Sequence, residues 1–221
     1  MRGPREEAKE RAEALAASLG ELPDDERERW VLALCAEVLD RDHDDAGAGD
    51  PRLASAVVRE VVAPVLAARV RERDPDAARW ASSLLRRRRC APSVWEDLLP
   101  GATPVSLLED AARWRPDDPR ILEPLVRHYD RTYAYATHEL PAGVLYAYDG
   151  ATAEESAELL DGLDTLEQWV RTLGRADEYA DRIAFLRRIV REWEAYRAQS
   201  DLLPFEAYLG VHFPEWRDAR A

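Results

Sequence analysis

Two histidines and a glutamate are the residues of this sequence best suited to acid–base chemistry. His128 and His138 lie ten residues apart, and Glu139 follows His138 directly. Because imidazole titrates near neutral pH, either ring could accept or donate a proton at a bound substrate. A helix would place the two rings roughly 80° apart around its axis, so we do not expect them to act as a pair. The competing interpretation is that both histidines are structural or surface residues.

Four tyrosines in the same stretch are the candidate binding residues. Aromatic rings with a polar tip supply large contact area at binding surfaces. They suit an ordinary core equally well, and the core is the interpretation that we favour. The four candidates are Tyr133, Tyr135, Tyr146 and Tyr148.

Carboxylates are dense enough to suggest a metal site only near residues 40–50. A calcium loop of the EF-hand type needs glycine at its sixth position and glutamate at its twelfth. Counted from Asp40, these positions hold Asp45 and Pro51. Motifs for zinc, for a nucleophilic serine and for a phosphate-binding loop are also missing from the sequence. We therefore predict a solvated acidic loop, with no metal site, no cofactor and no assigned catalytic residue.

Composition and charge narrow the class of partner. The chain is 46% hydrophobic and 34% charged, with a formal net charge of −13. This charge repels nucleic acids and anionic membranes, so we expect neither as a partner, and it favours a basic protein. Only Lys9 among the 31 basic residues is lysine, which is typical of a GC-rich bacterial genome. Two cysteines, no hydrophobic leader and no apolar run of about 20 residues predict a cytoplasmic protein.

Proline marks the beginnings of several predicted helices. Four times a residue that can cap a helix is followed by proline, which fits the first turn because it lacks an N–H. The pairs are Asp50-Pro51, Asp74-Pro75, Thr103-Pro104 and Asp118-Pro119. Apolar periodicity predicts further helices over 5–19 and 24–39, and a short one over 93–99. Pro64 lies inside the helix predicted over 51–73, where it should kink or split the helix.

The segment 132–148 permits two predictions. Residues 132–137 and 144–148 alternate with a period of two, and a plausible turn lies between them, which indicates a small β-hairpin. Alternatively, the helix that begins at Pro119 continues to His138 and is followed by an ordered loop. We favour the helix.

The C-terminal third gives the clearest helical signal. Thr152 and Glu155 have the spacing of a capping box. Two matched apolar stripes, separated by Gly174, then predict an antiparallel helical hairpin. The stripes are Leu159, Leu163, Leu166, Val170 and Leu173, and Tyr179, Ile183, Leu186, Val190 and Trp193. The aromatic tail over 201–216 should fold back over the core.

The junction over 108–129 resembles the seam between two tetratricopeptide repeats. In that pattern, an alanine-rich helix end and a proline precede a helix with leucine and tyrosine four residues apart. The matching residues are Ala111, Pro116, Leu125 and Tyr129. The resemblance implies stacked antiparallel helices, in a class of domain that mostly binds peptides or proteins.

We therefore predict an all-α fold, either an antiparallel helical bundle or an α-solenoid-like stack of about 8 to 10 helices. We expect a single domain over 1–221, built from N-terminal helices (1–115), the seam with the Tyr-rich segment (116–150), and the C-terminal hairpin with its tail (151–221).

The favoured function is a non-enzymatic interaction module that binds a basic partner protein through a helical groove. An adaptor, a regulator or an immunity-type inhibitor would fit this description. The alternative is a small-molecule-binding protein or enzyme with its pocket at 128–148. The sequence does not determine the oligomeric state.

Overall fold

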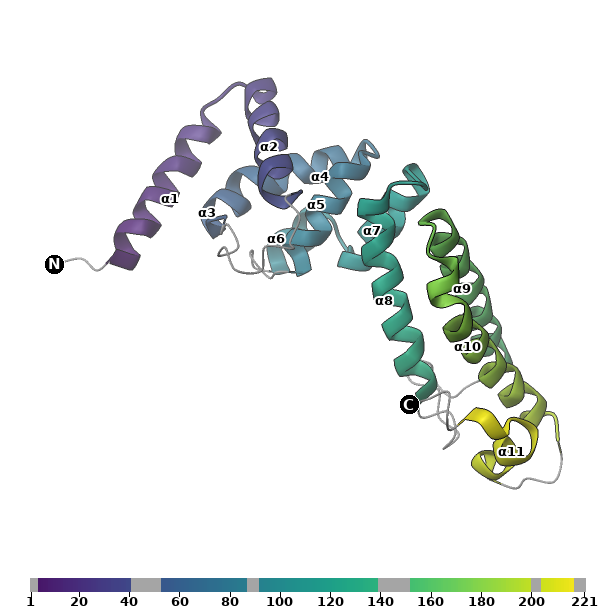
Figure 1. The fold of residues 1–221 in the computed structure, drawn as a ribbon. Helices are drawn as coiled ribbons and strands as arrows, with labels where there is room; N and C mark the ends of the chain where they lie inside the picture. Colours follow the sequence, from purple (N-terminus) through teal and green to yellow (C-terminus); the bar gives the residue numbers. More distant parts are fainter. Residues whose placement is uncertain (1–3, 41–52, 87–91, 139–151, 200–203, 217–221) are drawn as a thin grey trace. The chain divides into compact units, whose positions relative to one another are not determined.

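A computed structural model of the chain describes residues 4–40, 53–86, 92–138, 152–199 and 204–216. These residues are mostly helical and include no strand, which confirms the predicted all-α class (Figure 1). The α-helices are α1 (Pro4–Gly20), α2 (Asp24–Leu39), α3 (Ser55–Val57), α4 (Ala63–Arg71), α5 (Pro75–Arg86), α6 (Pro92–Leu98), α7 (Pro104–Trp114), α8 (Pro119–His138), α9 (Ala153–Thr172), α10 (Ala176–Arg197) and α11 (Phe205–His212). A π-helix, η1 (Val58–Val62), precedes α4, and a 3-10 turn, η3 (Pro214–Trp216), follows α11.

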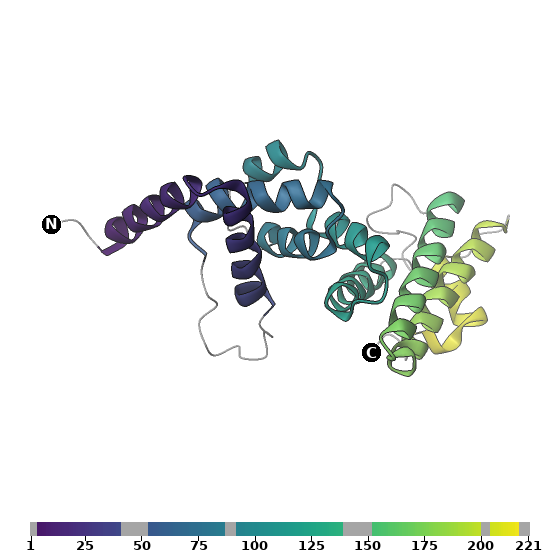
Figure 2. The same cartoon turned by 90° about the horizontal axis from the view of Figure 1, so that it is seen from above.

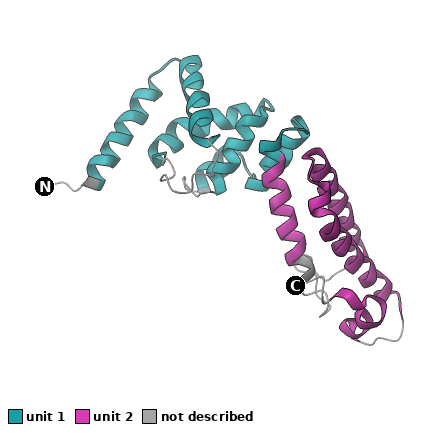
Figure 3. Ribbon diagram, viewed as in Figure 1, with its two compact units in different colours: residues 1–121 teal, residues 122–221 magenta. Residues whose placement is uncertain are grey.

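The chain divides into two compact units (Figure 3). Unit 1 comprises residues 1–121 and unit 2 comprises residues 122–221. The boundary falls within α8, so the first residues of this helix belong to unit 1 and the rest belong to unit 2.

The capping residues act as the sequence predicts. The Asp74 carboxylate accepts hydrogen bonds from the backbone N–H groups of Asp76 and Ala77 at the start of α5, at 3.0 and 3.2 Å. The Asp118 carboxylate accepts one from the Arg120 N–H at the start of α8, at 3.0 Å. Thr103 caps α7 in the same way. The Asp50-Pro51 pair lies outside the described residues.

Pro64 interrupts the third predicted helix, and the interruption takes the form of the π-helix η1. The N–H of Ala63 donates to the carbonyl of Val58, five residues earlier. Proline has no N–H and its ring clashes with the preceding turn, so a wider turn accommodates it at the start of α4.

In unit 1, α5 packs against both α4 and α7, and α2 packs against α5. Figures 1 and 2 show α4 and α5 lying side by side. The largest fully buried side chains of this core are Leu66, Leu84, Leu107, Leu108 and Ile121. In α1, by contrast, Ala16 and Leu19 are buried but Leu15 is 48% exposed.

In unit 2, α9 and α10 form the predicted hairpin, and Gly174 turns the chain between them with a φ of 68°. Thr152 and Glu155 form the predicted capping box. Most of both predicted stripes is buried, and Leu173 and Tyr179 are partly buried against them. The aromatic tail folds onto the same core through Phe205, Tyr208, Leu209, Phe213 and Trp216.

The helix α8 continues to His138, as we expected in preference to the hairpin. Residues 132–137 are therefore helical and not a strand, because the apolar face that begins at Leu122 continues along the helix through Tyr133. The second half of the proposed hairpin, 144–148, lies outside the described residues.

Candidate functional site

The histidine and tyrosine candidates on α8 have different surroundings. The exposed His128 has its Nε2 3.4 Å from the Thr132 hydroxyl, and its ring meets Tyr129 edge-on, with 5.2 Å between centroids. Tyr135 is 59% exposed. His138 is the last residue of α8. The remaining candidates, Glu139, Tyr146 and Tyr148, lie outside the described residues.

Tyr133 is a core residue of unit 2. Its side chain is 5% exposed and belongs to the hydrophobic cluster formed with α9 and α10. The ring lies directly over Gly162 in the middle of α9, where an added Cβ would overlap the tyrosine hydroxyl. Gly162 therefore allows the close approach of α8 and α9, and Tyr133 fills the space that a larger residue would occupy.

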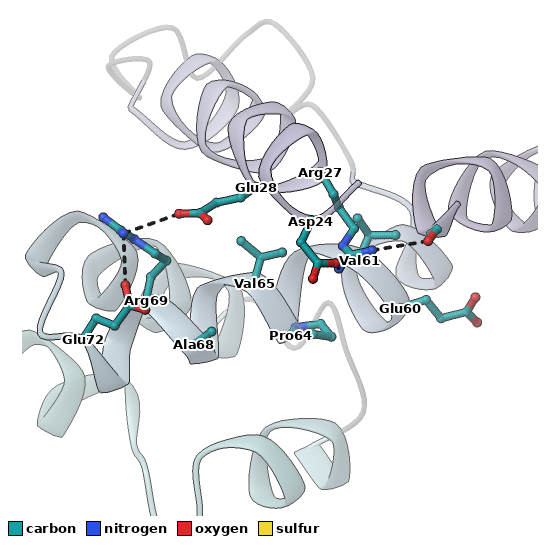
Figure 4. A pocket seen from close by; sticks show the side chains of 11 residues that line it. Asp24, Arg27, Glu28, Glu60, Val61, Pro64, Val65, Ala68, Arg69 and Glu72 are labelled. Carbon is teal, nitrogen blue, oxygen red and sulfur yellow. Dashed lines mark hydrogen bonds and ion pairs between the residues drawn. The ribbon is translucent and has the colours of Figure 1, made fainter. Parts of the chain in front are cut away.

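The structure shows a groove in unit 1 (Figure 4). It lies between α2 and the η1–α4 segment and has a volume of about 520 Å³. We call it the α2–α4 groove. Its lining residues are Gly20, Asp24, Arg27, Glu28, Glu60, Val61, Pro64, Val65, Ala68, Arg69 and Glu72.

The middle of the α2–α4 groove is apolar. Val61, Pro64, Val65 and Ala68 come from successive turns of η1 and α4 and lie between the charged residues in Figure 4. Pro64 and Ala68 are exposed and Val65 is partly buried. An apolar floor with a polar margin is the arrangement found at protein interfaces.

At one end of the groove, Arg69 is shared among three carboxylates. Its Nη1 lies 3.4 Å from Glu28 on α2 and 3.0 Å from Glu72, and its Nη2 lies 2.8 Å from Asp74. The Asp74 hydrogen bond raises the pKa of Arg69, so its charge is permanent. Three negative charges around one positive charge leave this end negative.

At the other end, Arg27 holds the turn between α1 and α2. Its Nη1 donates to the carbonyls of Gly20 and Leu22 at 3.3 and 3.4 Å, and its Nη2 pairs with Asp24. Both groove arginines are thus committed to partners in the chain. The lining residues comprise four acids and two arginines, a formal charge of −2.

A second charged cluster in unit 1 is a structural clamp. It joins the end of α2, α5 and the α7–α8 connection through Asp40, Asp76, Asp118, Arg79, Arg115 and Arg120. Three carboxylates face three guanidinium groups, so the charges balance. Asp40 also accepts a hydrogen bond from the Trp80 indole at 2.6 Å.

The clamp holds two of its carboxylates, Asp118 and Asp76, ionised. The Arg120 hydrogen bond lowers the pKa of Asp118 to about 2, against the opposing effect of burial. Burial of Asp76 likewise opposes its ionisation, but hydrogen bonds from Arg115 and Arg79 outweigh it and lower its pKa. Groups held in one charge state are poor proton carriers near neutral pH, which favours a structural role for the clamp.

Cys35 is buried in unit 1 beside this clamp. Burial, reinforced by the charge of Asp40, raises the pKa of its thiol to about 12. The thiol therefore stays protonated near neutral pH, which makes Cys35 a poor nucleophile.

Among the residues that the structure describes, no group of three or more histidine, cysteine, aspartate or glutamate side chains has an arrangement that could hold a metal ion. No helix in the described part is both long and apolar enough to cross a membrane. Comparisons with protein-family models, with curated proteins and with solved structures found no match to this chain.

Sequence reasoning missed the groove, although one signal was present. Glu60, Pro64, Ala68 and Glu72 recur every four residues, so along a helix each would lie about one turn after the previous one. The opposite wall comes from α2, about 40 residues earlier, and periodicity along one helix carries no information about that contact.

Proposed function

We propose that the protein is a non-enzymatic interaction module that binds a basic partner protein through the α2–α4 groove. The observation that carries this proposal is the combination of an apolar floor with a rim of four carboxylates. The apolar floor gives a partner surface to bury, and the negative rim favours cationic side chains at its margin.

The residue types in the groove also favour binding over catalysis. Its lining includes no histidine, cysteine, serine, threonine or tyrosine. It therefore offers no hydroxyl or thiol group that could act as a covalent nucleophile. Its two arginines are engaged within the chain and help to fix the groove walls. Walls held in place before binding lower the entropy cost of association.

The proposal extends to the architecture and the setting. We propose one α-solenoid-like domain in which Ala111 and Leu125, both fully buried, belong to a tetratricopeptide-like seam. An adaptor, a regulator or an immunity-type inhibitor of a bacterial cytoplasm would suit such a domain. The net charge of −13 supports a basic partner.

Site-specific photo-crosslinking in the native host tests the proposal. A photoreactive residue is placed at Ala68 in the groove, and a matched one at Ala157, an exposed alanine of α9. We expect one protein to be captured from position 68, to be lost at high salt, and to be absent at position 157. In a second chain, the photoreactive residue is placed at the neighbouring Val65 and Ala68→Trp fills the groove. If the protein is still captured from this chain, the groove is not the binding site.

A further inference from the structure

Four exposed residues form one stripe along the α2–α4 groove. Glu60, Pro64, Ala68 and Glu72 all line it, and each lies about one turn after the previous one along η1 and α4. Carboxylates occupy both ends of the stripe, and small side chains occupy its middle. The stripe thus presents two anionic points separated by a low apolar floor.

The length of the stripe sets the length of a matching ligand. Glu72 lies twelve positions after Glu60, which corresponds to about 18 Å of helix at a rise of 1.5 Å per residue. A second helix laid along the groove covers the same distance with about 11 or 12 of its own residues.

The floor suits a helix because it is low. Pro64 and Ala68 do not project far from α4, so a partner backbone can approach closely. Side chains at four-residue intervals also form the kind of ridge and groove along which helices pack. An aliphatic ridge on the partner would bury itself between the two carboxylates.

The negative charge is strongest at the Glu72 end. Glu72 and Glu28 come from opposite walls and share Arg69, which Asp74 also binds. At the other end, the exposed Glu60 pairs with its sequence neighbour Arg59 at 2.6 Å. A partner cation therefore meets surplus negative charge at one end and a solvent-exposed carboxylate at the other.

We infer that the occupant of the groove is an amphipathic helix that carries two basic side chains about 11 residues apart, with small aliphatic residues between them on the same face. This inference rests on the proposed function and names the chemistry of its partner. One basic side chain pairs with Glu60, and the other pairs with Glu72 and Glu28.

Defined peptides test the inference on the full chain. The probe is a fluorescent helical peptide with an aliphatic ridge and two arginines about 11 residues apart. A second peptide has the same composition with the arginines about 7 residues apart, and a third carries glutamates in their place. Binding is measured by fluorescence anisotropy to the wild-type chain, to Glu60→Gln/Glu72→Gln and to Ala68→Trp. Glu154→Gln/Glu158→Gln, on exposed positions of α9, is the matched charge control.

We expect the first peptide to bind about tenfold more tightly than the second. This preference should vanish in Glu60→Gln/Glu72→Gln and persist in Glu154→Gln/Glu158→Gln. If all three peptides bind equally well and Ala68→Trp abolishes this binding, the inference is overturned, although the groove remains a binding site. Binding that Ala68→Trp leaves unchanged would also count against the proposed function. If no peptide binds while crosslinking at position 68 succeeds, the inference alone fails.

Discussion

At the scale of single residues, Gly162 and Tyr133 show how a candidate binding residue becomes a structural one. A tyrosine in a Tyr-rich stretch suggests a pocket, but this ring lies against the backbone of α9. Glycine in the middle of a helix costs about 1 kcal/mol relative to alanine, so its presence indicates a packing requirement.

Gly162→Ala should destabilise unit 2 despite the better helix propensity of alanine. The new methyl group would overlap the Tyr133 hydroxyl, and such overpacking costs about 1–3 kcal/mol. Urea denaturation followed by circular dichroism measures the loss. Adding Tyr133→Phe to Gly162→Ala should recover part of it, because the closest atom is removed. A Gly162→Ala chain as stable as the wild type would refute this account of the glycine.

Asp118 should contribute stability that depends on pH. Its folded-state pKa of about 2 lies below the value of about 3.9 for an unfolded aspartate. Stability from this group is therefore present above about pH 4 and is lost as the pH falls through about 2.

Asp118→Asn keeps a side chain that can cap α8 but removes the charge, so it should cost on the order of 2 kcal/mol at pH 7. The difference from wild type should shrink as the pH approaches about 3. Asp118→Ala, which also removes the cap, should cost more. Urea midpoints at the two pH values provide the measurement, and a pH-independent difference for Asp118→Asn would rule out the charge effect.

At the scale of elements, α11 packs on the core of unit 2 through one face only. Leu209 is fully buried in the core of unit 2, whereas Val211, two residues later, is 71% exposed. Arg188 of α10 lies over the Phe213 ring at 4.0 Å and donates to the carbonyl of His212 at 3.2 Å. Both contacts hold the end of this short helix.

Leu209→Ala should therefore lower the free energy of unfolding by about 2–4 kcal/mol, because it leaves a cavity in a packed core. Val211→Ala is the matched control on the same helix and should change stability by less than about 0.5 kcal/mol. Chemical denaturation of the two variants decides the point. Similar effects of both substitutions would mean that α11 does not dock as described.

The elements that local chemistry specifies were predictable from the sequence. Thr103 and Asp118 cap their helices next to a proline, and the Thr152–Glu155 box begins α9, because these interactions span only a few residues. The packed stripes of α9 and α10 were likewise visible as periodicity. The contacts that build the candidate site and the clamp were not, because they join distant residues: Arg69 meets Glu28 across the groove, and in the clamp Arg120 reaches Asp40 across 80 positions.

At the scale of the whole molecule, the formal charge of −13 should govern how fast a basic partner arrives. Electrostatic steering raises association rates and is screened by salt, with a Debye length of about 10 Å at 0.1 M.

The association rate of the two-arginine peptide should accordingly fall about tenfold between low and physiological salt, with a smaller change in its dissociation rate. Stopped-flow anisotropy separates the two rates. The glutamate peptide is the control and should show the opposite trend. A salt-independent association rate for the two-arginine peptide would argue against steering by the acidic surface.

The π-helix before Pro64 has a consequence for the length of its segment. Buried pairs along this stretch step by five residues across the π-helix, from Val57–Val58 to Val62–Ala63, and then by four to Leu66–Ala67. Each residue of a helix advances the chain by about 100°, so the extra residue resets the angular phase between α3 and α4. Deleting one residue of η1 would make the helix more regular. It would also rotate one side of the segment, so that either the buried valines leave the core or Glu60 turns away from the groove. The number of residues in this segment is therefore constrained by the packing on both sides of the π-helix.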